Sequence, residues 1–138
     1  MPKDLVVLPR LYDVYGALLT ERQRELFELY YEQDLSLAEI SEETGITRQG
    51  ARDAIGHAEA ALREFEEKLG LLARIEAAEA ARARIVKAAN DLDVINRTGF
   101  KNPRAARLID ELREAASALS ETALWGAPLS DVRTKNTE

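Results

Sequence analysis

The chain has 138 residues, with 19 Lys and Arg against 25 Asp and Glu, a net charge of −6, and 46% hydrophobic residues. This composition is typical of a soluble globular domain with one modest core. The absence of Cys excludes disulfide scaffolds, zinc fingers and thiol catalysis, and the single histidine, His57, excludes a metal site built from several histidines. No segment approaches the ~18–20 apolar residues of a membrane span, and the apolar stretch at residues 5–8 is too short for a secretory signal. We therefore expect a cytoplasmic protein.

The excess of acidic residues lies in the first half of the chain. Residues 1–75 contain 9 basic and 15 acidic residues, whereas residues 76–138 contain 10 of each. Nucleic-acid binders usually carry a basic footprint, which this chain lacks. Composition alone therefore weighs against nucleic-acid binding.

The pattern along the chain is helical. Apolar residues recur at spacings of three and four, and no segment alternates as a strand would, which predicts an all-α fold. A first short helix covers residues 11–19 and is entered through Pro9. A second helix begins after Thr20, whose hydroxyl is placed to form a capping box with Gln23, and it stops near Asp34.

Residues 36–56 have the spacing of a helix-turn-helix. Ser36 caps a short helix with Glu39 as its capping-box partner, Gly45 suits the left-handed residue that ends this helix, and Thr47 caps the next one. The shared core is predicted to contain Ile40, Ile46, Ala51 and Ile55. An ordinary pair of antiparallel helices in a small bundle is the alternative, and the spacing alone does not separate the two.

A long helical arm follows residue 55. Its apolar seam consists of Leu62, Phe65, Leu69 and Leu72, and then shifts to Ile75, Ala78, Ile85, Ala89 and Leu92. This shift predicts a slip or bend near Gly70. Gly99 interrupts the pattern, and Asn102 caps a last helix with Pro103 at its first position. One face of that helix carries Leu108, Ile109, Leu112, Ala116, Leu119 and Ala123.

These elements predict three parts. A small helical bundle containing the helix-turn-helix covers residues 1–63, the arm and the C-terminal helix cover residues 64–125, and residues 126–138 form a disordered tail. The arm's seam exceeds what one neighbouring helix covers, so we predict a homodimer made mainly by the second half. The C-terminal helix folding back onto the arm is the competing account. We expect Trp125 to pack on the core rather than to anchor a partner.

Five stretches within residues 12–72 carry a family resemblance: Leu19–Arg24, Asp34–Ser41, Thr47–Gln49, Asp53–Ile55 and Phe65–Leu71. They resemble the YlxM family of small bacterial helix-turn-helix proteins, whose fold is similar to region 4 of sigma factors. Genes of that family typically neighbour those of the signal recognition particle GTPases. The resemblance implies a non-enzymatic accessory or regulator of the signal recognition particle pathway that binds its protein or RNA component.

The would-be recognition helix departs from the family's usual pattern. Gly50, Ala51 and Arg52 stand where members commonly have Ala-Val-Tyr, and Gly56 and His57 stand where members often have a basic pair. A glycine inside a helix destabilises it by about 1 kcal/mol relative to alanine. The loss of two cations also removes phosphate contacts. Both departures weigh against direct reading of DNA.

The candidate nucleic-acid-binding residues are Arg48, Gln49, Arg52, Arg22 and Arg24. The first three follow the Thr47 cap, where a recognition helix presents side chains to base edges, and we expect them to project outward together. Arg22 and Arg24 are candidates for phosphate contacts, although lone surface arginines are usually only solvated.

Two functions remain open. One is an adaptor of the signal recognition particle, and the alternative is a DNA-binding transcription regulator that uses residues 36–63. A lone histidine without a Cys partner or a carboxylate motif makes no active site, so we predict no catalytic residue, no metal and no cofactor.

Overall fold

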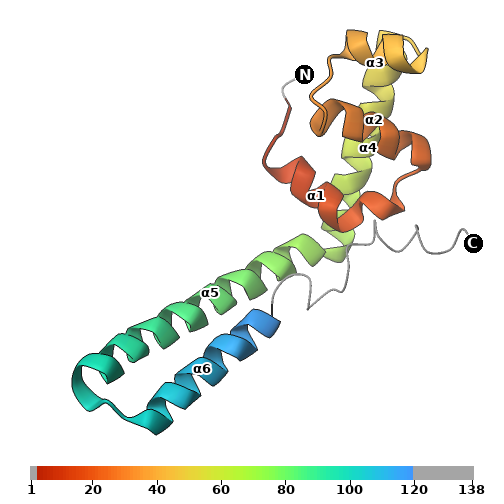
Figure 1. The fold of residues 1–138 in the computed structure, drawn as a ribbon. Helices are drawn as coiled ribbons and strands as arrows, with labels where there is room; N and C mark the ends of the chain where they lie inside the picture. Colours follow the sequence, from red (N-terminus) through yellow and green to blue (C-terminus); the bar gives the residue numbers. More distant parts are fainter. Residues whose placement is uncertain (1–2, 120–138) are drawn as a thin grey trace, which may run out of the picture. The chain divides into compact units, whose positions relative to one another are not determined.

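The computed structural model describes residues 3–119, and these residues form helices without any strand (Figure 1). The elements are α1 (Val7–Tyr15), a 3-10 turn η1 (Gly16–Leu18), α2 (Glu21–Tyr31), α3 (Leu37–Thr44), α4 (Arg48–Leu69), α5 (Leu71–Ile95), a π-helical turn η2 (Asn96–Phe100) and α6 (Pro103–Ala118). The predicted all-α fold is confirmed. The helices form two compact units, the first ending at Leu72 and the second beginning at Ala73. The boundary predicted after residue 63 lies inside α4.

Three helices begin at the N-caps that the sequence predicts. The Thr20 hydroxyl accepts a hydrogen bond from the Gln23 backbone N–H at 3.2 Å, and the Gln23 side chain accepts one from the Thr20 N–H at 3.0 Å. Ser36 and Glu39 form the same reciprocal pair at 3.2 and 2.7 Å. Thr47 caps α4 by accepting a backbone N–H at 3.0 Å. These bonds satisfy backbone donors that have no partner inside a helix.

The first helix starts earlier than predicted. α1 begins at Val7 and has Pro9 in its first turn, where the N–H that proline lacks would have no helical partner. The Asp4 carboxylate accepts the Val7 N–H at 3.0 Å at this end. The helix gives way to the 3-10 turn at Gly16, where a Cβ would lie 2.9 Å from the Tyr12 ring. The single helix predicted over residues 11–19 is therefore two short elements.

α4 is the central helix of the first unit and contacts α1, α2 and α3. Two clusters of buried side chains line it. One cluster joins α1 and α2 to α4 and consists of Leu8, Leu11, Tyr15, Leu19, Phe27, Ala58, Leu62 and Leu72. The other joins α2 and α3 to α4 and consists of Leu26, Leu29, Tyr30, Ile40, Ala51 and Ile55. The second cluster is the one that positions the helix-turn-helix.

Glu66 links the end of α4 to the start of α5. α4 stops at Gly70, which has a left-handed φ of 62°, and the predicted break near this residue is confirmed. The Tyr15 hydroxyl donates to Glu66 Oε2 at 2.7 Å, and the Leu72 N–H donates to the same oxygen at 3.0 Å. The Leu71 N–H donates to the Tyr15 hydroxyl at 3.0 Å. The first backbone donors of α5 therefore have partners on α1 and α4.

Most of the predicted apolar seam around Gly70 packs within one chain. Leu62 and Leu72 are buried in the first unit, and Phe65 packs against the same cluster. The assignment of these three residues to a dimer seam is therefore wrong, because α1 and α2 supply the apolar surface that covers them. Leu69, the fourth residue of the seam, is 49% exposed.

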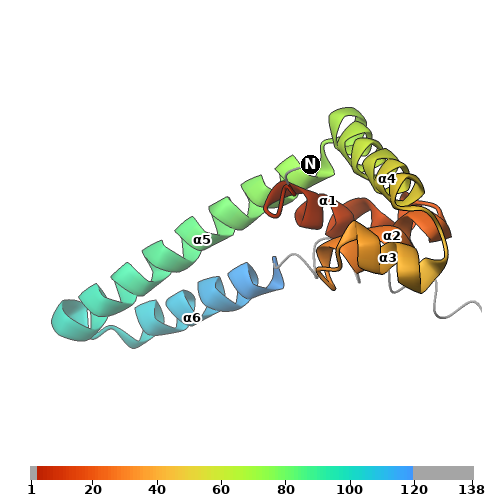
Figure 2. The same ribbon diagram turned by 90° about the horizontal axis from the view of Figure 1, so that it is seen from above.

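The second unit is an antiparallel hairpin, in which Figures 1 and 2 show α5 and α6 side by side. The Arg113 guanidinium donates to Asn90 Oδ1 at 2.9 and 3.0 Å and to Asp93 Oδ2 at 3.2 Å. At the tip, the Asn96 side chain donates to the Asn102 carbonyl at 3.0 Å and accepts the Asn102 N–H at 2.8 Å. The C-terminal helix thus folds back onto the arm.

The start of α6 matches the prediction and the preceding turn differs. Asn102 caps the helix by accepting two backbone N–H groups, and Pro103 occupies its first position. Gly99, predicted to interrupt the helical pattern, lies inside the π-helical turn η2, and the left-handed residue that ends this turn is Lys101, with a φ of 48°. The predicted end of this helix, the packing of Trp125 and the tail over residues 126–138 lie outside the described residues.

Three tyrosine hydroxyls of the first unit donate to glutamate carboxylates. The pairs are Tyr12–Glu28, Tyr15–Glu66 and Tyr31–Glu59. Burial, followed by the adjoining carboxylate, raises the pKa of all three phenols above the ordinary value of 10.0. Each phenol therefore stabilises the fold only while it keeps its proton.

We expect the free energy of unfolding to fall as the pH rises above about 10. A phenol whose pKa is raised by folding contributes stability that is fully present below its unfolded pKa and is lost as the pH rises through the folded value. Tyr31→Phe removes one such group and should make the fall smaller. Urea titrations of both proteins at about pH 8 and about pH 11 measure this difference. A fall of the same size in Tyr31→Phe would show that the phenol is not responsible.

Candidate nucleic-acid interface

The turn between α3 and α4 is tight and closed by hydrogen bonds. Gly45 has a φ of 76° and donates its N–H to the Ser41 carbonyl at 3.0 Å, which ends α3. The Ser41 hydroxyl donates across the turn to the Ile46 carbonyl at 2.5 Å. A residue other than glycine at position 45 would have to adopt the left-handed conformation, which L side chains disfavour. The predicted helix–turn–helix spacing is present.

The side chains between the two helices are those that the helix register predicts, with one difference. Ile40 and Ile55 are 0% and 1% exposed, and Ala51 is fully buried. Ile46 lies in the turn and is only partly buried, although it packs against the same cluster. The prediction that Ile46 is a core residue is therefore met in part, because a turn residue has fewer neighbours around it.

Arg48, Gln49 and Arg52 are all exposed on the first two turns of α4, as predicted. Arg48 and Arg52 are four residues apart and share one face of the helix. Neither of them forms an ion pair within residues 3–119. Two guanidinium groups are therefore available at the position where a recognition helix meets nucleic acid.

The charge around these residues is acidic rather than basic. Gln49 Nε2 donates to Asp53 Oδ1 at 2.8 Å, so the amide is already held by a carboxylate on the same helix. The sequence did not lead us to single out Asp53 as a residue of this site. Its spacing of four residues from Gln49, which places both side chains on one face of the helix, is the pattern that indicates this hydrogen bond. Residues 36–63 contain five acidic residues against three arginines. Electrostatic attraction for phosphates is accordingly weak at this surface.

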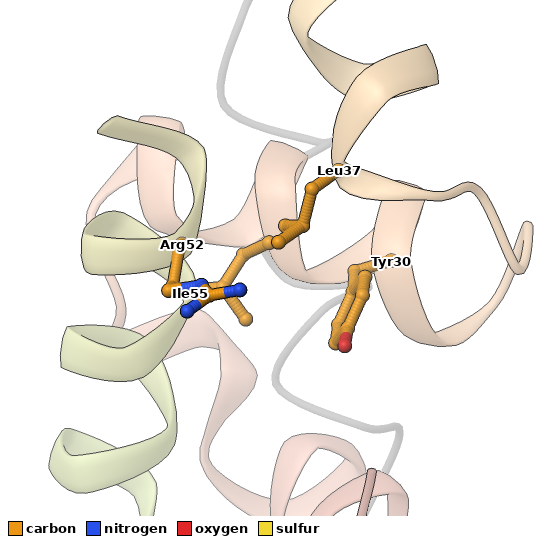
Figure 3. Close-up of a pocket in the computed structure, with 4 residues that line it drawn as sticks. All are labelled: Tyr30, Leu37, Arg52 and Ile55. Atoms are coloured by element: carbon orange, nitrogen blue, oxygen red, sulfur yellow. The ribbon is translucent and has the colours of Figure 1, made fainter. Parts of the chain in front are cut away.

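Arg52 also lines a small hollow between α2, α3 and α4. Figure 3 shows Arg52 and Tyr30 on opposite sides of it, with Leu37 and Ile55 completing the wall. The hollow has a volume of about 20 Å³, which is room for about one water molecule. It is far smaller than a cavity that holds a metabolite. Small-molecule recognition at this site is therefore not supported.

Arg22 and Arg24 have other surroundings. Arg22 pairs with Glu25 at 2.7 Å on the exposed surface of α2. Arg24 is half-buried, and its Nε has no hydrogen-bond partner in the part of the chain that the structure describes. Both residues belong to α2, and no hydrogen bond or ion pair within residues 3–119 links them to the exposed residues of α4.

His57 is exposed on α4, and no group of three His, Asp or Glu side chains in residues 3–119 has the arrangement of a metal site. No helix in these residues combines the length and the apolar character needed to cross a membrane.

Two helices joined by a tight turn, with the second helix capped and its first turns exposed, define a helix-turn-helix protein. The chain belongs to the YlxM / p13 like helix-turn-helix family (UPF0122), whose family model matches residues 3–98. The resemblance to the YlxM family is thereby confirmed.

Relatives support the same assignment. The chain is 40% identical over 120 residues to a UPF0122 protein of Thermoanaerobacter sp. strain X514, with 87% of this chain and 99% of that protein covered. It is 38% identical over 113 residues to a UPF0122 protein of Symbiobacterium thermophilum, with 82% and 80% covered. It is 56% identical over 72 residues to one of Caldanaerobacter subterraneus, with 52% and 62% covered. No solved structure matches the chain.

Proposed function

We propose that this protein binds nucleic acid through the start of α4 and catalyses no reaction. The observation that carries the proposal is the exposed set of Arg48, Gln49 and Arg52 on a capped helix that α3 supports. Arginine recognises the guanine edge and glutamine the adenine edge in a bidentate manner. The hydrogen bond from Gln49 to Asp53 leaves the two arginines as the main contacts.

The proposed role is that of an accessory or regulator of the signal recognition particle pathway in the cytoplasm. It rests on the YlxM resemblance, which implies binding to the RNA or protein component of that particle. The acidic first half of the chain favours this role over DNA binding, because duplex DNA demands many phosphate contacts. The alternative is a transcription regulator that binds DNA through residues 36–63, in a fold like region 4 of sigma factors. The helix–turn–helix spacing supports that alternative.

We expect Arg52→Ala to weaken nucleic-acid binding by about 1–3 kcal/mol if the side chain reaches a base, and to reduce the dependence on salt if it reaches a phosphate. Fluorescence anisotropy with labelled duplex DNA and with signal recognition particle RNA, each at two salt concentrations, distinguishes the two cases. Arg63→Ala is the matched control. Arg63 lies about three turns beyond Arg52 on α4 and pairs with Asp4 at 3.0 Å. Equal weakening by both substitutions would contradict a site at the start of α4.

A pull-down with the signal recognition particle GTPase and its RNA separates the role from its alternative. Retention of either component, with no steep salt dependence of DNA binding, supports the accessory role. Tight DNA binding that falls steeply with salt, together with no retention, supports the transcription regulator.

We also propose that the protein is a homodimer formed by the second unit. Support comes from large apolar side chains on α5 and α6 that remain exposed after the two helices pack together. They include Ile85 at 40%, Leu92 at 49% and Leu108 at 52%. Light scattering should give about twice the chain mass of 15.4 kDa. A mass of one chain at tens of micromolar would contradict the dimer.

A further inference from the structure

We infer that two copies of the α5–α6 hairpin pack face to face into a four-helix bundle, related by a two-fold axis that passes beside Ala88. This inference rests on the proposed homodimer and specifies its interface. It concerns only the second unit, whose two helices are held together by Arg113 and by the Asn96–Asn102 pair.

Each helix of the hairpin carries an exposed apolar seam in addition to its buried face. The α5 seam consists of Ala81, Ile85, Ala88, Leu92 and Ile95, and the α6 seam consists of Leu108, Leu112, Ala115 and Leu119. All nine residues are exposed, and their spacings alternate between three and four. That spacing is typical of a seam that packs against another helix. Both helices therefore present a second packing surface that nothing in residues 3–119 covers.

The two seams lie on the same side of the hairpin. At about 100° per residue, each seam is displaced from the buried residues of its own helix by about a quarter turn, in the same rotational sense. Because α5 and α6 are antiparallel, equal displacements in the same sense point to the same side. Asn90 on α5 and Arg113 on α6 are displaced from the buried residues of their helices in the opposite rotational sense. The hydrogen bonds between them therefore lie on the other side of the hairpin. One side is thus apolar and the other polar.

The apolar side is complementary to itself. A two-fold axis beside Ala88 places Ile85 of one copy opposite Leu92 of the other. The Asn96–Asn102 contact puts the start of α6 level with Asn96, so the residue of α6 that is level with Ala88 is close to Asp110. The same axis therefore places Leu108 opposite Leu112 of the second copy. A single operation thus pairs large residues in both seams and brings the two copies of Ala88 together where the α5 helices approach most closely.

Charge is also complementary under this operation. Arg84 lies on the outer edge of the α5 seam and forms no ion pair within residues 3–119. The axis brings it within one turn of Asp91 of the second copy, whose carboxylate meets Lys87 at 2.8 Å in its own chain. A second copy of the chain therefore matches the α5 seam in shape, in apolar pattern and in charge.

The absence of Cys from the chain makes the interface directly testable. Ala88→Cys places one thiol beside the axis, where two copies of it meet within the ~4.4–6.8 Å between Cα atoms that a disulfide needs. Ala83→Cys is the matched control, because Ala83 is exposed on α5 but lies on the polar side. Under mild oxidation of the intact chain, we expect Ala88→Cys to form covalent dimers and Ala83→Cys to remain a single chain on denaturing gels.

Leu112→Glu provides an independent measurement. Leu112 is 44% exposed in the hairpin, so the helix content measured by circular dichroism should not change, whereas light scattering should show loss of the dimer. If the unmodified protein has the mass of two chains but Ala88→Cys cross-links no faster than Ala83→Cys, this interface is wrong and the homodimer stands. If the unmodified protein has the mass of one chain, both are wrong.

Discussion

Replacing Phe27 by alanine is expected to lower the free energy of unfolding of the first unit by about 3–5 kcal/mol. Phe27 has no exposed surface, and its ring stacks between Tyr12 at 4.6 Å and Tyr31 at 4.4 Å. Truncation removes both stacking contacts and leaves a cavity between α1, α2 and α4 that surrounding helices fill only in part. Since small domains are stable by only about 5–15 kcal/mol, this single change brings the unit close to unfolding.

Urea denaturation followed by circular dichroism measures the loss. Phe100→Ala is the control, because Phe100 is 78% exposed and its removal should change stability by no more than about 0.5 kcal/mol. Losses of similar size in the two variants would contradict the placement of Phe27 at the centre of the core.

Leu62→Ala is expected to destabilise the first unit by about 2–5 kcal/mol, whereas Leu69→Ala, two turns further along α4, should have an effect below about 1 kcal/mol. Leu62 is fully buried, and Leu69 is 49% exposed. The two substitutions remove the same atoms from the same helix, so their difference measures burial alone. Denaturant midpoints of both variants against the unmodified protein provide the comparison.

This pair also tests how the arm's seam is used. A dimer seam that ran through α4 would place both leucines in one interface and make their truncation comparable. A large loss for Leu62 alone, independent of protein concentration, supports packing against α1 and α2 within one chain. A loss for Leu69 that grows on dilution would show that the first unit also takes part in the dimer.

On the surface of α4, the fold favours nucleic-acid binding whereas the amino-acid composition weighs against it. The helix-turn-helix positions Arg48 and Arg52 outward, yet acidic residues outnumber arginines over residues 36–63. Phosphate contacts supply most of the affinity of non-specific binding to nucleic acid. The proposed binding through two arginines would therefore depend on specific contacts more than on general attraction.

The sequence by itself determined the helix boundaries that depend on local interactions. The caps at Thr20, Ser36 and Thr47 and the glycine at position 45 are visible because each involves partners within three or four residues. The outward direction of Arg48 and Arg52 follows from the same register. These predicted features are present in the folded structure because the hydrogen bonds that define them form inside or beside a single helix.

Only the tertiary structure decided where the apolar seams are used. The bond between Tyr15 and Glu66 joins residues 51 positions apart, and it defines how α5 begins. Leu62 and Leu69 have the same chemistry and the same periodicity, but α1 covers only the first of them. The return of α6 along α5 likewise depends on Arg113 reaching Asn90, 23 positions away. Periodicity shows which side of a helix is apolar, whereas the neighbour that covers it is selected by contacts between residues that are distant in the chain.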